Sequence, residues 1–367
     1  MTWLPSLSSA RTWVALTALG GTFLAINACS SEPSSPRRSQ LNPGDDGTGA
    51  ASSTGTNVGG INVGTTGILQ TTANNGAGGT APRDPRCDAQ GNCSCINIGM
   101  IGRNGTFGAV PGQDSNSALV AWLNENSSAA AQAHLTKPEL TPEFLANYDV
   151  IILQALETSN GAEVVGTQWQ FSADESAAFE AWVRAGGGVI ALTGYGSFPE
   201  EAAPSNALLA FSGLQYAGLT GPGDSALEGS CPDECCYCLG NSIPSEGWLA
   251  THPISANVTA VGAYYGRSLT APATAEVVAR TGTMTLGATV QVDAGRVFMF
   301  HDEWVTYTSQ WDGTGLEDDC RYGDPNNSCN DIHPLNSYQV PQFWYNALKW
   351  VSGDVACFDI RDPEIIK

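Results

Sequence analysis

The stretch Phe171–Gly194, FSADESAAFEAWVRAGGGVIALTG, predicts the fold class more strongly than any other part of the chain. Ser172 and Glu175 have the spacing of a capping box, which begins a helix. The buried stripe of this helix is predicted from apolar residues at helical spacing: Phe179, Trp182 and Val183. Three glycines at 186–188 end the helix, and VIALTG continues as a buried strand. Two strands joined by such a helix form the crossover unit of a parallel sheet.

Apolar and amphipathic segments alternate on both sides of this unit. Buried strands are predicted at 95–102, 149–154, 275–280, 287–292 and 296–301. Helices are predicted at 117–126, 140–148, 203–214 and 340–353, the second with Thr141 as N-cap and Pro142 at its first position. A hairpin at 293–295 is expected to join the last two strands. The alternation predicts an α/β sandwich with a mainly parallel central sheet.

The first 86 residues have the character of an export signal and a tether. Residues 12–28 are uncharged and too short for a comfortable membrane span, so 1–28 is interpreted as a signal peptide. INAC, ending at Cys29, resembles the lipobox of bacterial lipoproteins, which implies lipidation of Cys29; ordinary cleavage nearby is the alternative. Residues 29–86 lack aromatic side chains and are predicted to be a disordered, lipid-anchored linker. An outer-membrane or cell-surface location is expected, with a periplasmic or secreted protein as the alternative.

The cysteines favour the same location. Eleven are present, and ten remain after Cys29. In an exported protein an even set predicts disulfides, here among Cys87, Cys93, Cys95, Cys231, Cys235, Cys236, Cys238, Cys320, Cys329 and Cys357. Zinc binding by CPDECCYC, 231–238, is the weaker alternative, because the adjacent Cys235 and Cys236 suit one metal poorly and export favours oxidation. Cys320 with Cys329 is the one pairing suggested by proximity in sequence.

The charge balance excludes some partners. The formal net charge is −21, from 36 acidic and 15 basic side chains. This excess argues against binding nucleic acid or anionic membrane surfaces. Membrane association is therefore expected only through the lipid anchor, and the acidity itself is accounted for by solubility.

The order of ESAAFEAWVRAGGGVIALTG, HPIS at 252–255, VDAGRVFMFHDEW and FWYNALKWVSG resembles the glutamine-amidotransferase-like superfamily, in its ThuA-like branch. The resemblance covers about 95–353. It implies a flavodoxin-like three-layer sandwich over 87–367, with its site at the carboxyl ends of the strands. Two additions to this domain are expected: a Cys-rich insertion at about 221–246 and an acidic loop at about 311–333.

The resemblance also proposes catalytic residues. FHDE is similar to the FHPE of the family's thiol enzymes, so His301 would be the base and Glu303 its orienting carboxylate. The nucleophilic Cys of that family would stand at Gly194, in the turn LTGYGS, which argues against glutamine hydrolysis by a thiol. Tyr195 and Ser197 in this turn remain candidates for ligand contact. The alternative for His301 is a structural role, capping the strand end.

Aromatic and acidic residues follow His301 closely. Trp304, Tyr307 and Trp311 alternate with carboxylates, a composition that suits a sugar-binding surface; a stapled surface loop is the alternative. Asp312, Asp318 and Asp319 stand among glycines and are compatible with calcium, although the EF-hand spacing is absent. The glycine-rich loop 102–112 is interpreted as a plain turn in preference to a phosphate cradle. No other cofactor is expected.

Two functions stay open at this level. The first is a surface-tethered, non-catalytic binding or structural module, with a carbohydrate or protein partner. The second is an exported hydrolase acting on carbohydrate or a cell-surface polymer through His301 and Glu303. The turn at 193–197 favours the first, because it places glycine and tyrosine where an enzyme of the superfamily places its nucleophile.

Overall fold

The computed structural model describes residues 86–87, 91, 93–103, 116–158, 166–193, 199–219, 243, 245–259, 261, 266–306, 311, 339–353 and 357–363. All of them belong to one compact unit, Gly64–Lys367. The predicted signal, Cys29 and the linker as far as residue 85 lie outside the described residues, as do most of the Cys-rich insertion and all of the acidic loop except Trp311. Arg86, predicted as the end of the linker, is the first residue of a strand instead. Within the described part, none of the helices combines the length and apolarity that crossing a membrane requires.

A nine-stranded mixed sheet forms the centre of the unit, in the order β4-β3-β5-β8-β13-β12-β10-β9, with β11 paired to β12. Its strands are β3 Asn97–Ile101, β4 Ala130–His134, β5 Val150–Leu153, β8 Gly188–Ala191, β9 Gln215–Leu219, β10 Arg267–Thr270, β11 Glu276–Thr281, β12 Met284–Val292 and β13 Gly295–Phe300. The strands from β4 to β13 run parallel, and the rest are antiparallel. In chain order the parallel strands lie 2-1-3-4-5, the order of flavodoxin-like sheets.

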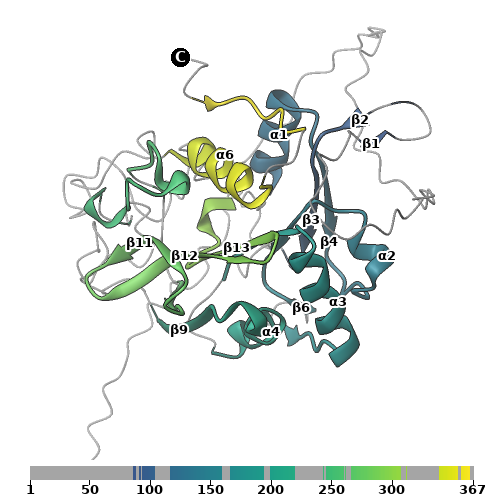
Figure 1. The fold of residues 1–367 in the computed structure, drawn as a ribbon, viewed down its shortest axis with the longest axis horizontal. Helices are drawn as coiled ribbons and strands as arrows, with labels where there is room; N and C mark the ends of the chain where they lie inside the picture. Colours follow the sequence, from purple (N-terminus) through teal and green to yellow (C-terminus); the bar gives the residue numbers. More distant parts are fainter. Residues whose placement is uncertain are drawn as a thin grey trace, which may run out of the picture. The chain divides into compact units, whose positions relative to one another are not determined.

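Helices cover both faces of this sheet (Figure 1). On one face lie α1, Ser117–Asn126, and α6, Val340–Val351, which share a core with β3, β5 and β13. On the other lie α2, Pro142–Leu145, α3, Ala173–Arg184, and α4, Ala202–Leu208, with a second core. The predicted α/β architecture with a mainly parallel central sheet is therefore confirmed.

The central unit folds as its sequence predicts. Ser172 accepts a hydrogen bond from the backbone N–H of Glu175, and the Glu175 carboxylate accepts one from the N–H of Ser172, so the capping box is complete. Phe179 and Val183 are fully buried. The helix leads into β8, which pairs in parallel with β5. A Cβ at Gly295 would lie 1.8 Å from the carbonyl oxygen of Val183, so the close packing of β13 on α3 requires glycine there.

Smaller elements complete the described part. Two short hairpins pair β1, Arg86–Cys87, with β2, Cys93–Ser94, and β6, Glu157–Thr158, with β7, Thr167–Gln168. Single 3₁₀ turns occupy Pro199–Glu201, Ala210–Ser212, Ser245–Gly247, Pro253–Ser255 and Trp304–Thr306. The predicted hairpin at 293–295 joins β12 to β13, with Asp293 in the left-handed region at φ 52°.

Four cysteines form two disulfides, Cys87–Cys93 and Cys95–Cys357. The second joins the segment before β3 to the chain that follows α6. Disulfides persist in oxidising compartments, so these pairs indicate an extracytoplasmic protein. The remaining cysteines predicted to pair, including Cys320 and Cys329, lie outside the described residues.

Candidate functional site

Polar residues gather where the parallel strands end, and we call four of them, Thr193, His301, Asp302 and Glu303, the His301 edge. Thr193 follows β8, and the other three follow β13. The Thr193 hydroxyl donates to the carbonyl oxygen of His301 at 2.8 Å, and the backbone N–H of Arg267 donates to the same oxygen at 2.8 Å. The ends of β8, β10 and β13 are therefore joined through the His301 backbone.

The His301 side chain is fully buried. Its ring meets that of Phe300 edge-on, with centroids 4.9 Å apart. Gly266 packs against it so closely that a Cβ there would lie 2.9 Å from the His301 Nδ1. Burial lowers the pKa of His301 to about 3. The imidazole is thus neutral at any physiological pH.

The two carboxylates beside it are also enclosed. Asp302 is fully buried, and its side chain accepts a hydrogen bond from the backbone N–H of Trp304 at 3.1 Å. Glu303 is 1% exposed. Its carbonyl oxygen accepts from both the N–H and the hydroxyl of Thr306, at 2.8 and 2.7 Å. The segment 301–306 is consequently a tightly hydrogen-bonded turn rather than an open loop.

Ionisable side chains from other elements lie close to the His301 edge. Tyr216 on β9 is buried and donates its hydroxyl to the carbonyl oxygen of Phe300 at 3.1 Å. Burial raises the pKa of Tyr216 well above its usual value, and the charges of Glu201 and Glu303 raise it further. Burial lowers the pKa of Arg267, against the opposing effect of Glu201. Acidic and basic groups are therefore enclosed together at this edge, where each limits the cost of burying the other.

A second polar group occupies the ends of β3 and β5, where the strand order reverses. Asn116 and Gln154 exchange two side-chain amide hydrogen bonds, each 3.0 Å long, and both are buried. The Asn116 N–H also donates to the carbonyl oxygen of Thr306 at 3.1 Å. An ion pair of 2.6 Å joins Arg103 and Glu157 in the same region. Open α/β sheets bind ligands at such a reversal point, but here the described polar groups are occupied with one another.

The predicted aromatic surface is only partly described. Trp304 is buried at 6% exposure. Trp311 is half-buried, donates its indole N–H to the carbonyl oxygen of Val305 at 3.2 Å, and lies 5.6 Å from the ring of Trp122 on α1. Both predicted rings are thus engaged in packing within the chain. A sugar-binding role for them remains a prediction.

The other predicted site residues fall outside the described part of the chain: Tyr195, Ser197, Tyr307, Asp312, Asp318 and Asp319. Their proposed ligand and calcium contacts stay predictions. Among the residues that are described, no group of three or more His, Cys, Asp or Glu side chains is arranged to hold a metal ion.

A pocket of about 430 Å³, which we call the α6 pocket, lies at the opposite ends of the strands. Polar, cationic and aromatic side chains line it, chiefly Arg296, Gln342, Tyr345, Asn346, Lys349 and Trp350. Arg296 is near the start of β13, paired with Gly188 at the start of β8. No local pattern in the sequence predicts this pocket, although two of the segments around it, HPIS and the last helix, belong to the motifs quoted above.

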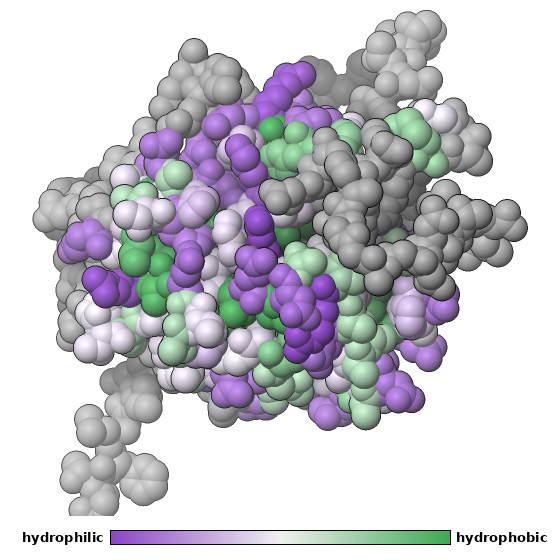
Figure 2. Space-filling model, viewed as in Figure 1, coloured by the Kyte–Doolittle hydropathy of each residue, from purple (hydrophilic) through white to green (hydrophobic). Residues whose placement is uncertain are grey.

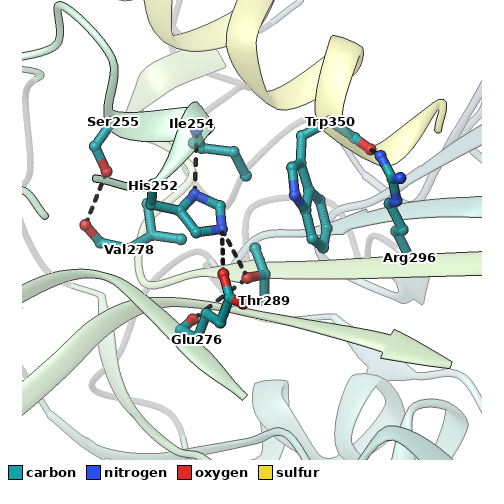
Figure 3. Close-up of polar contacts among 8 residues, drawn as sticks. All are labelled: His252, Ile254, Ser255, Glu276, Val278, Thr289, Arg296 and Trp350. Atoms are coloured by element: carbon teal, nitrogen blue, oxygen red, sulfur yellow. Dashed lines mark hydrogen bonds and ion pairs between the residues drawn. The ribbon is translucent and has the colours of Figure 1, made fainter. Parts of the chain in front are cut away.

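The HPIS histidine supports one wall of this pocket (Figure 3). His252 Nδ1 accepts a hydrogen bond from the N–H of Ile254 at 3.1 Å, so Nε2 carries the proton and donates to the Thr289 hydroxyl at 3.0 Å. Burial lowers the pKa of His252, with Glu276 opposing. The ring of Trp350 lies between His252 and Arg296, which fixes its position.

No protein-family model matches the chain, and no curated protein matches it. Solved structures give weaker likenesses. The mmIFT52 N-terminal domain has 14% identity and a TM-score of 0.44, covering 70% of this chain and 98% of its own. Cytoplasmic protein STM1381 from Salmonella typhimurium LT2 has 16% identity and a TM-score of 0.43, covering 70% and 99%. A ThuA-like protein from Bacteroides uniformis has 13% identity and a TM-score of 0.33, covering 57% and 84%. At these identities the likeness concerns the fold alone.

Proposed function

We propose that this protein is an extracytoplasmic, non-catalytic binding module tethered to a membrane through Cys29. The observation that carries the non-catalytic part is the complete burial of His301, whose pKa falls to about 3. A general base must reach the proton that it removes, and its pKa should lie near the working pH. His301 meets neither requirement.

Glu303 supports the same proposal. Its side chain is 1% exposed, and a carboxylate that orients or protonates a substrate has to reach that substrate. With Gly194 at the position of the nucleophile, His301 and Glu303 contribute to holding the strand ends together. On the face shown in Figure 2, the hydrophobic residues lie in separate patches between hydrophilic ones.

Hydrolysis assays test the non-catalytic proposal. The purified full-length chain is assayed against chromogenic glycosides and esters from pH 5 to 8, beside His301→Gln and Glu303→Gln. We expect no turnover above the buffer rate in any of the three. Turnover by the native chain that disappears in both folded variants would establish the hydrolase instead.

Lipid labelling tests the tether separately. The sequence before Cys29 resembles a lipoprotein signal, and the two disulfides agree with export. We expect labelled palmitate to enter the native chain and to be absent from Cys29→Ala. Equal labelling of both chains refutes the anchor without bearing on the role of His301.

A further inference from the structure

The α6 pocket lies away from the His301 edge, at the amino ends of β8 and β13. One wall is a face of α6, on which Gln342, Asn346 and Lys349 recur at helical spacing. The opposite wall includes the 3₁₀ turn Pro253–Ser255 and the residues after it. Its volume of about 430 Å³ falls within the range of small-molecule sites, roughly 300–1,000 Å³.

Two cations enter this pocket without a carboxylate partner among the described residues. Arg296 donates from Nη1 to the carbonyl oxygen of Trp350 at 2.7 Å and lies 5.5 Å from the centre of its ring. Lys349 donates to the hydroxyl of Tyr345 at 3.1 Å and lies 5.1 Å from its ring. Both contacts hold a cation in place while leaving its charge uncompensated.

In the whole chain acids outnumber bases by 36 to 15. Three described cations, Arg103, Lys137 and Arg184, form ion pairs with carboxylates, which Arg296 and Lys349 do not. Among the described residues that line the pocket, Asp362 is the one carboxylate, beside the two cations.

The pocket also offers a hydrogen-bond acceptor that is open to solvent. Asn346 donates its amide N–H groups to the carbonyl oxygens of Ile254 and Ala256, at 3.0 and 2.7 Å, so its oxygen must accept. That oxygen accepts from Gln342 Nε2 at 3.0 Å. The amide of Gln342 is therefore fixed with its Oε1 free of any hydrogen bond to the described residues, although the side chain is 7% exposed.

We infer that the α6 pocket binds a hydroxylated carboxylate, of the kind presented by a uronic acid unit of an acidic saccharide. The carboxylate lies against Arg296 and Lys349, since Arg and Lys form charge-assisted hydrogen bonds with such a group. A hydroxyl donates to Gln342 Oε1, which only a ligand with an O–H or N–H can satisfy. A neutral sugar would leave the cations without a counter-charge, and an anion without an O–H or N–H group would form no hydrogen bond with this oxygen.

Binding measurements on the full-length chain test this class of ligand. Glucuronic acid, galacturonic acid, glucose and sulfate, an anion without an O–H group at neutral pH, are titrated separately by calorimetry at low salt. We expect at least one uronic acid to bind at least about tenfold more tightly than glucose and sulfate, as the loss of a hydrogen bond to the pocket predicts. Equal binding of glucose, equal binding of sulfate, or no uronate binding each overturns the inference.

Variants locate the binding. Lys349→Gln and Arg296→Gln should each weaken uronate binding about tenfold or more. Arg280→Gln is the matched control, because Arg280 is exposed on β11, does not line the pocket, and loses the same charge. Arg296 also donates a hydrogen bond to the carbonyl oxygen of Trp350 near the end of α6, so Arg296→Gln could fail to fold. In that case Lys349→Gln alone tests whether the ligand binds in this pocket. Unchanged binding in Lys349→Gln overturns the assignment to this pocket.

The inference rests on the proposed binding role but can fail separately from it. The absence of uronate binding leaves the burial of His301 and the expected lack of hydrolysis unaffected. Turnover dependent on His301 and Glu303 would refute the non-catalytic proposal, while uronate binding lost in Lys349→Gln would still support this pocket.

Discussion

Replacing His301 by Gln should flatten the dependence of stability on pH. Burial places the pKa of the folded imidazole at about 3, against 6.5 for the unfolded chain. Between these values the unfolded state binds a proton that the folded state does not. The free energy of unfolding therefore rises with pH across this window, and falls as the pH drops from 6.5 towards 3.

The expected size follows from the shift. One pKa unit corresponds to about 1.4 kcal/mol, so the full difference approaches about 5 kcal/mol at pH 3. At pH 5, only the first 1.5 units or so have been crossed, and the loss is about 2 kcal/mol. This range avoids most carboxylate titration, which begins at lower pH.

Urea unfolding from pH 7 to 5 measures the effect, with the native chain and His301→Gln compared at each pH. The substitution also changes the packing, which lowers the free energy of unfolding of the variant at every pH. The informative quantity is therefore how the difference in free energy of unfolding between the native chain and the variant changes from pH 7 to pH 5. We expect that change to be about 2 kcal/mol. His134→Gln is the control: His134 is less buried and burial lowers its pKa less, so its curve should differ less. Parallel curves for the native chain and His301→Gln would refute the argument.

Three further substitutions probe the scaffold by urea unfolding. Gly266→Ala should cost about 2–4 kcal/mol, because its Cβ would lie 1.7 Å from the carbonyl oxygen of His301; a loss below about 0.5 kcal/mol would contradict this close packing. Ser172→Ala should cost about 1 kcal/mol through loss of the helix cap, whereas Ser172→Asp, which can still cap, should cost clearly less; equal losses would count against the cap. Cys357→Ser should cost about 2–5 kcal/mol and free the thiol of Cys95 for labelling; an unlabelled Cys95 would disprove the pairing.

The sequence predicted best the elements whose own residues determine them. The capping box at Ser172, the apolar run at 150–153 and the Pro142 start of α2 are all found as expected. By contrast β4, Ala130–His134, has the sequence AAQAH, which lacks β-branched residues and gives no strand signal. Its conformation comes from pairing in register with β3, which is a tertiary effect.

The candidate site shows the same contrast between local sequence and tertiary contacts. The sequence predicts that His301 lies at the end of a strand, because the apolar run before it marks that strand. The sequence does not predict that its side chain is buried, because Gly266, which packs against it, belongs to a segment 35 residues earlier that carries no local signal. The resemblance to a catalytic motif therefore predicted where His301 lies without predicting whether it can reach a substrate.

The α6 pocket shows why polar residues on a predicted helix need their partners to be interpreted. From the sequence, Gln342 and Lys349 are ordinary solvent-facing residues of an amphipathic helix. The carbonyl oxygens of the HPIS turn fix the Asn346 amide, that amide fixes Gln342, and an acceptor is thereby left directed into a cationic pocket. Each step of this chain joins residues about 90 positions apart or one helical turn apart. Any binding specificity of this pocket is therefore a property of the packing of α6 on the HPIS turn, and a change at that contact should alter binding without touching the ligand.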